Sequence, residues 1–90
     1  SQIGQPRSFS RRSGNQWFIG VINGTMPRRE TVSLNFLGQG DYKLVELADD
    51  PERGDAFIRT ERTVTRKSSL TLPLRPDGGY VAWLVPVAGK

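Results

Sequence analysis

The chain has ninety residues, of which thirteen are basic and nine acidic, for a formal net charge of +4. A chain of this length buries about two thirds of its unfolded surface, which supports one small core and excludes a deep cleft between two lobes. The sequence contains neither cysteine nor histidine. Disulfides, thiolate metal sites and the commonest general base in enzymes are therefore excluded.

The apolar residues are distributed along the chain in a way that indicates a single domain with short flanking segments. No apolar run approaches the roughly 20 residues that span a bilayer, so we expect no membrane partner. We predict a flexible lead over residues 1–7, a single β-sandwich domain over residues 8–87 and a short tail over residues 88–90. The positive charge permits a polyanion partner without requiring one.

The first half of the chain has apolar residues with a period of two, which predicts strands. Ser8–Arg12 is a candidate first strand. Gln16–Ile22 is apolar on both faces, which predicts a central strand that is wetted on neither side. Thr31–Phe36 alternates cleanly between apolar and polar residues. In Asp41–Leu47 the apolar residues cannot all share one face, so we expect a bulge or a strand covered on both sides.

The second half continues the same pattern. Ala56–Arg66 is β-prone and charged on alternate residues, and Leu70–Leu74 alternates around Pro73, which lacks an N–H and therefore predicts an edge strand or an outward proline. Tyr80–Val85 is almost continuously apolar and is predicted to be covered on both sides.

Glycine, asparagine and proline turns separate these runs. About seven short strands without a helical period predict an all-β fold, a small antiparallel β-sandwich, with a closed barrel as the alternative. The residues predicted to form its core are Trp17, Ile19, Val32, Leu34, Phe36, Tyr42, Leu70, Leu72 and Val81.

Three kinds of binding site can be considered from the residues alone. The acidic loop 49–55 offers oxygen ligands for a cation, but its order lacks the alternation of a calcium loop, which favours a solvated turn. Arginines and aromatic residues could form a nucleic-acid-binding barrel, but interspersed acidic residues argue against it. A flat tryptophan could stack on a sugar. Trp17 and Trp83 lie in strands that favour core or interface positions, and their exposure to solvent discriminates between the two readings.

An enzymatic function requires two carboxylates placed as acid and base. All nine acidic residues fall in predicted turns or at alternate polar positions, where no apolar pocket would raise a pKa. We therefore expect the isolated chain to be non-catalytic, with no cofactor and no metal site of its own.

The order of several motifs resembles the C-terminal domain of glycoside hydrolase family 97. The resemblance runs from about Ser10 to Leu84, and it is carried by the joint spacing of five segments, with Thr63-Val64-Thr65 in support. These segments are Arg11-Arg12, Gln16-Trp17-Phe18-Ile19-Gly20-Val21-Ile22-Asn23, Pro27-Arg28-Arg29, Leu34-Asn35-Phe36-Leu37-Gly38-Gln39-Gly40-Asp41-Tyr42 and Gly78-Gly79-Tyr80-Val81-Ala82.

The resemblance implies a parent enzyme, a bacterial α-glucosidase or α-galactosidase with a (β/α)₈ barrel that holds the catalytic carboxylates and calcium. None of those catalytic or calcium-binding residues can be placed on this chain. The resemblance also implies a structural or oligomerisation role and favours the bacterial periplasm or cell envelope.

The partners we expect are the catalytic barrel of the same chain and a homo-oligomer, with no nucleic acid. An independent carbohydrate-binding module, or a small nucleic-acid-binding barrel, is the alternative. One face of the last strand must fill the core, so its other face leaves apolar area for an interface. The residues predicted to contribute to that interface are Arg11, Arg12, Arg28, Arg29 and Trp83.

Overall fold

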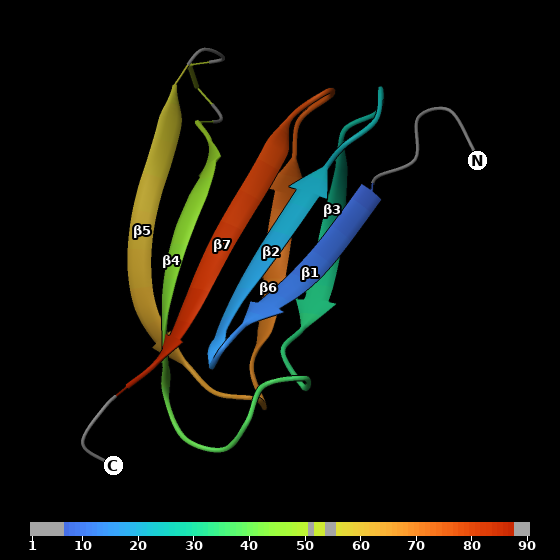
Figure 1. Ribbon diagram of the computed structural model, residues 1–90. Helices are drawn as coiled ribbons and strands as arrows, with labels where there is room; N and C mark the ends of the chain where they lie inside the picture. The colour runs from blue at the N-terminus through green and yellow to red at the C-terminus, as the bar shows by residue number, and fades with distance from the viewer. Residues whose placement is uncertain (1–6, 51, 54–55, 88–90) are drawn as a thin grey trace.

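A computed structural model of the chain describes residues 7–50, 52–53 and 56–87. These residues form seven strands and no helix, and hence no helix that could cross a membrane. The predicted antiparallel β-sandwich of seven strands is confirmed (Figure 1). The strands are β1 (Arg7–Ser13), β2 (Gln16–Ile22), β3 (Arg28–Ser33), β4 (Tyr42–Asp49), β5 (Phe57–Val64), β6 (Ser69–Leu74) and β7 (Gly79–Pro86).

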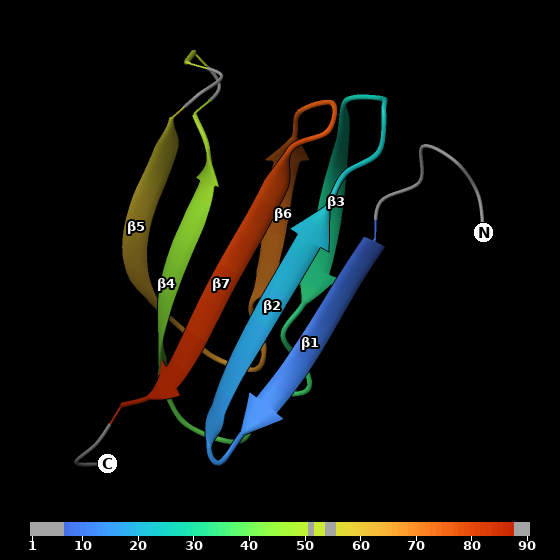
Figure 2. The same cartoon turned by 45° about the horizontal axis from the view of Figure 1, so that its top comes forward.

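Two sheets of unequal size make up the sandwich. The larger has the strand order β1-β2-β7-β4-β5, and the smaller consists of β3 and β6, with every pair antiparallel. Figures 1 and 2 show the small sheet behind β2 and β7 in both views. The last strand is therefore the middle strand of the large sheet, and two strands flank it on each side.

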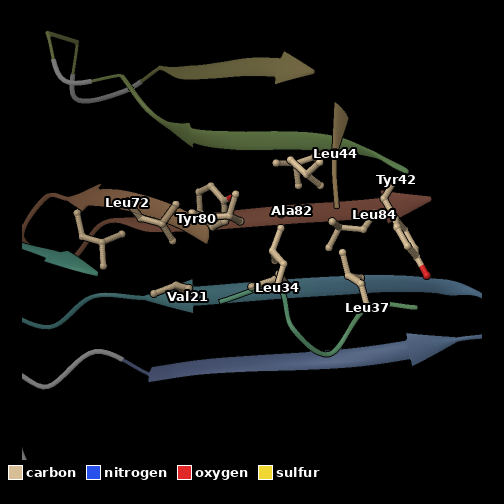
Figure 3. Close-up of a cluster of buried hydrophobic side chains, with 13 residues drawn as sticks. Val21, Leu34, Leu37, Tyr42, Leu44, Leu72, Tyr80, Ala82 and Leu84 are labelled. Atoms are coloured by element: carbon tan, nitrogen blue, oxygen red, sulfur yellow. The ribbon is translucent and has the colours of Figure 1, made fainter. Parts of the chain in front are cut away.

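The core fills the space between the two sheets (Figure 3). Leu70, Leu72 and Leu74 point inward from β6, while Pro73 is exposed, as predicted for a proline in an edge strand. From the large sheet, alternate residues of β2, β4 and β7 face these leucines. The buried apolar side chains that those strands contribute to the core are Ile19, Val21, Tyr42, Leu44, Tyr80, Ala82 and Leu84.

A buried asparagine ties two connections together at one end of the sandwich. Asn23 follows β2 and is only 4% exposed. Its Nδ2 donates hydrogen bonds of 2.7 Å to the carbonyl oxygens of Met26 and Arg75. Its backbone N–H donates to the Gly78 carbonyl at 2.8 Å. Because buried carbonyl groups need donors, this side chain fixes the β2–β3 connection against the β6–β7 turn.

The strand β2 has the predicted bounds, and the other six strands differ from the predictions by one to three residues at one or both ends. The third strand was expected over Thr31–Phe36 but covers Arg28–Ser33. Leu34 is buried just after the strand ends, where its N–H donates to the Ser68 carbonyl and a turn follows. The first strand is confirmed but begins at Arg7, inside the expected lead. Residues 1–6 and 88–90 of the expected lead and tail lie outside the described residues.

The predicted coverage of the large sheet is wrong for its outward-facing residues. Val81 was expected in the core but is 50% exposed, because Tyr80 and Ala82 take the inward positions of β7. Phe18 and Ile22 of β2 are likewise exposed. The pairing of β4 shows no bulge; Leu44 faces the core and Leu47 the outside. These strands are thus apolar on both faces, but the residues that the structure describes cover only one of these faces.

A candidate docking surface

The outer face of the large sheet is the face that points away from β3 and β6, and it carries most of the exposed apolar side chains. Ten large hydrophobic residues are exposed in the described part of the chain, and strand alternation places seven of them on this face. These seven are Phe9, Phe18, Ile22, Leu47, Phe57, Val81 and Trp83. They extend over all five strands, so the apolar surface is contiguous.

Two aromatic rings make the centre of the outer face flat. Phe18 of β2 and Trp83 of β7 are cross-strand partners, and their rings stack with centroids 5.9 Å apart and an interplanar angle of 12°. The Trp83 Nε1 donates a hydrogen bond of 2.8 Å to the Gln16 Oε1. Because the polar atom of the indole already has a partner, the exposed part of Trp83 is apolar.

A shallow depression lies beside these rings. It has a volume of about 350 Å³, and its lining includes Phe9, Ile22, Leu47, Phe57 and Val81 around Gly20. A Cβ atom on Gly20 would collide with the ring of Phe9. The glycine therefore lets the Phe9 side chain lie across β2 from the edge strand.

Charged residues border the outer face on both sides. Arg7 and Arg11 lie on β1, and a cluster of Lys43, Arg59 and Glu61 lies on β4 and β5. The Glu61 carboxylate accepts from the Lys43 Nζ at 3.0 Å and from the Arg59 Nη1 at 2.6 Å. Hydrogen bonds from these two cations lower the pKa of Glu61. The border thus has two arginines on one side of the sheet and, on the other, two cations that share one carboxylate.

A second, polar cluster lies on the inner face of the large sheet, beside the small one. The Glu46 carboxylate accepts hydrogen bonds from the Tyr80 hydroxyl at 2.6 Å and from the Thr60 hydroxyl at 3.0 Å, and it pairs with the Arg62 Nε at 3.5 Å. Burial, and next the hydrogen bond to Glu46, raise the pKa of Tyr80. The Glu46 carboxylate is thus engaged by three side chains, at the edge of a cavity of about 280 Å³ that Leu72 and Pro73 of β6 also line.

The remaining carboxylates of interest are engaged with the backbone. The Asp49 Oδ2 accepts from the Gly79 N–H at 3.0 Å, and the Asp50 Oδ1 accepts from the Glu52 N–H at 2.8 Å. Within the described residues, no three His, Cys, Asp or Glu side chains are grouped to hold a metal ion. Residues 51, 54 and 55 of the acidic loop lie outside that description.

The five predicted interface residues fall on different sides of the molecule. Arg11 and Trp83 lie together on the outer face of the large sheet. Arg12 alternates to the other face of β1, where its Nε donates to the Gly14 carbonyl at 3.0 Å. Arg28 and Arg29 lie on β3, in the opposite layer. The structure therefore brings together two of the five residues.

Sequence reasoning missed most of the apolar members of this surface. Phe9 and Phe57 lie on the two edge strands, where the neighbouring charged residues interrupt the apolar pattern that would have indicated a surface. Val81 was assigned to the wrong face of its strand. The available signal was the apolar character of both faces of β2 and β7, which indicates two coverings for one sheet.

The two tryptophans are also separated. Trp17 points inward and packs on Phe36 with ring centroids 4.7 Å apart, whereas Trp83 is 43% exposed on the outside. Trp17 therefore has the position of a core residue, whereas Trp83 has that of a residue on a solvent-facing surface.

Comparison with known proteins identifies relatives of the chain. Residues 1–85 match the family described as Glycosyl-hydrolase 97 C-terminal, oligomerisation. The chain is 32% identical over 79 residues to a probable retaining alpha-galactosidase from Streptomyces bingchenggensis (strain BCW-1), a match that covers 88% of this chain and 12% of that protein.

Solved structures share the fold. The chain is similar to a Glycoside Hydrolase Family 97 enzyme in complex with panose, from Pseudoalteromonas sp. strain K8, with a TM-score of 0.85 and 24% identity over 92% of this chain and 14% of that one. It is also similar to a beta-arabinopyranosidase, with a TM-score of 0.70 and 25% identity over 88% of this chain and 12% of that one. The chain thus spans about an eighth of the length of these relatives.

Proposed function

Because the chain belongs to the glycosyl-hydrolase 97 C-terminal oligomerisation family, we propose that the outer face of its large sheet is the surface by which it docks on a neighbouring subunit. The resemblance drawn from the sequence motifs is confirmed. The role that the family description gives to this non-catalytic domain is oligomerisation. The proposal assigns that role to one face of the fold.

The observation that carries the proposal is the concentration of seven exposed apolar side chains on a single sheet face. The largest apolar patch on an ordinary monomer is a few hundred Å², and larger ones mark interaction surfaces. A partner layer that covers Phe18, Val81 and Trp83 would remove their apolar area from water, at about 25 cal/mol per Å². The charged border would then remain hydrated, as at the rim of protein interfaces.

The activity of the parent protein is a second part of the proposal. A retaining alpha-galactosidase is the name of the curated relative, and a panose complex is known for the structural one. We propose an α-glycosidase that acts on α-galactosides or α-glucosides. Its catalytic carboxylates, and the calcium implied by the resemblance, lie in parts of the parent other than this chain.

A matched pair of variants tests the docking surface. Leu47 on the outer face is 41% exposed, and Ile58, which points from β5 to the opposite side of the same sheet, is 42% exposed. Sedimentation of the chain at hundreds of micromolar should show association in the wild type and in Ile58→Ser. Leu47→Ser should weaken it. Equal association of both variants, or a wild type that stays monomeric, would contradict the proposal; the second result would favour the catalytic barrel of the same parent chain as the occupant.

A second candidate function is carbohydrate binding, favoured by the flat stack of Phe18 and Trp83. Aromatic faces of this kind can stack on sugar rings. However, the depression beside the stack is lined mainly by apolar side chains, and sugars also need hydrogen-bonding partners. Calorimetric titration with panose and with galactose distinguishes the two functions. We expect no heat of binding; saturable binding that Trp83→Ala abolishes would support a carbohydrate-binding module.

A further inference from the structure

We infer that the outer face pairs with the same face of a second copy of this chain, about a twofold axis that runs along β7. This inference rests on the proposed function and names the partner of that surface. Its starting point is the strand order β1-β2-β7-β4-β5, in which β7 lies in the middle. A twofold axis parallel to the middle strand superposes β2 of one copy on β4 of the other, and β1 on β5.

The strand register shows which residues such an axis brings together. One row across the outer face contains Arg11, Phe18, Trp83, Val45 and Glu61. The next row contains Phe9, Gly20, Val81, Leu47 and Arg59. Rotation about an axis along β7 preserves the position along the strands. Each row therefore lies on the same row of the second copy, in reversed order.

The edge strands are chemically complementary under this rotation. Arg11 of β1 faces Glu61 of the second copy, which pairs opposite charges. In the adjacent row, the ring of Phe9 leans over Gly20 of β2, so it adds to the apolar middle of the interface. In the next row toward the other end of the strands, Arg7 of β1 is in register with Ile22 of β2, and Phe57 of β5 is in register with Asp49 of β4. Arg7 therefore lies near Phe57 of the second copy. Arg7 and Arg11 of β1 thus each face a complementary residue of β5.

The middle of the interface is apolar under the same rotation. At the axis, Trp83 of one copy lies on Trp83 of the other, and Val81 of one copy lies on Val81 of the other. Leu47 of one copy faces the Phe9 ring that covers Gly20 of the other, at the shallow depression of the outer face. Aligned packing of two twisted sheets rotates them by about 30°, a displacement at the edges that long arginine and glutamate side chains can span.

Charge disfavours the other way of stacking two such faces. A twofold axis perpendicular to the strands places β1 on β1, so that the arginines of one copy approach those of the other. Glu61 would then lie on the far side of the sheet from Arg11. The Glu61 carboxylate already accepts from Lys43 and Arg59, but its two oxygens offer about four acceptor positions, so a third cation can bind.

The size of the sheet sets the strength of the pairing. Five strands about 4.8 Å apart and about 23 Å long cover on the order of 500 Å² in projection. Pairing would bury on the order of 1,000 Å² in total, which is the lower end for a specific interface. We therefore expect a weak dimer, observed at hundreds of micromolar.

Charge reversal tests the inference, because twofold symmetry makes a specific prediction about mixtures. Arg11→Glu alone and Glu61→Arg alone should each weaken dimerisation about tenfold at low salt, since each creates two like-charge pairs in the dimer. An equimolar mixture of the two variants should recover wild-type association, because each copy then supplies the charge that the other lacks. The double variant should dimerise with itself. Arg29→Glu, on the opposite layer, is the matched control and should have no effect.

The outcomes separate the inference from the proposed function. If Leu47→Ser weakens association but the mixture associates no better than the single variants, the outer face is used and the twofold pairing along β7 is wrong. If the wild type stays monomeric, the proposed function fails as well. Far-UV circular dichroism and the urea midpoint confirm that each variant is folded. Should Glu61→Arg fail to fold, Glu61→Gln should weaken dimerisation less than Arg11→Glu.

Discussion

Two leucines of β4 provide a direct test of which face of the large sheet the chain itself covers. Leu44 is fully buried between the sheets, and Leu47, three residues further on, is 41% exposed on the outer face. Both lie in the same regular strand, paired with β5 and β7. Replacing each in turn by alanine removes the same three carbon atoms from the same backbone environment.

The expected cost of each substitution follows from burial. Three fully buried carbons contribute about 2.5 kcal/mol at roughly 0.8 kcal/mol each. Leu44→Ala also leaves a cavity, so its total cost should be about 3 to 4 kcal/mol. Leu47→Ala loses only the buried part and leaves no closed cavity, for a cost of about 1 kcal/mol. A difference of about 2 kcal/mol corresponds to roughly 8 to 16 °C in Tm for a domain of this size.

Urea unfolding at low micromolar concentration, followed by far-UV circular dichroism, measures this difference in the monomer. The two variants should differ again in sedimentation, where Leu47→Ala weakens association among molecules that remain folded. If Leu47→Ala costs as much as Leu44→Ala in the monomer, Leu47 is buried by the chain itself. The argument for an uncovered outer face would then fail.

Three further predictions concern other parts of the fold. Asn23→Ala should lower the free energy of unfolding by about 2 to 4 kcal/mol, measured in urea, because two buried carbonyl groups lose their donor. Above about pH 10 the tyrosines of the unfolded chain lose protons, whereas the folded state holds the Tyr80 proton because its pKa is raised. Tyr80 therefore makes its full contribution to the free energy of unfolding below that pH, and this contribution is lost as the pH rises further. The wild type and Tyr80→Phe should differ in tyrosinate absorbance only once the chain unfolds. Gly20→Ala should displace the exposed ring of Phe9 and weaken association while changing the urea midpoint little; an unchanged association would show that the depression is not part of the interface.

The fold was largely predictable because a period of two and the turn residues are local signals. The alternation of Leu70, Leu72 and Leu74 around outward residues was confirmed, and so was the outward position of Pro73. The position of β7 between β2 and β4 was not predictable, because the pairing partners of a strand depend on contacts between residues far apart in the chain. The end of β3 was missed for a related reason: Leu34 is buried from a turn, where alternation no longer indicates a strand.

The candidate surface was only partly predictable. An apolar face on the last strand, bordered by arginine, followed from the continuous run from Tyr80 to Val85. Alternation within that run could not decide between Val81 and its neighbours, because both sets are apolar. The separation of Arg29 from Trp83 depends on the division of the strands into two sheets. Glu61 could be recognised as a border residue only once β5 was known to be an edge strand.

The distribution of apolar residues and charges over the large sheet has one consistent physical explanation. Strands that are apolar on both faces belong to sheets with a layer on each side, and β3 and β6 supply only one such layer. The apolar middle strands would supply the free energy of docking, which is non-directional. The charges on β1 and β5 protect the sheet edges from uncontrolled strand addition. They also lie where they can fix the orientation of a partner, since charged borders determine specificity more than affinity. A surface with an apolar centre, arginines along β1 and a carboxylate on β5 is therefore suited to a weak, oriented contact. Reversal of Arg11 alone, or of Glu61 alone, opposes that orientation without removing the apolar centre.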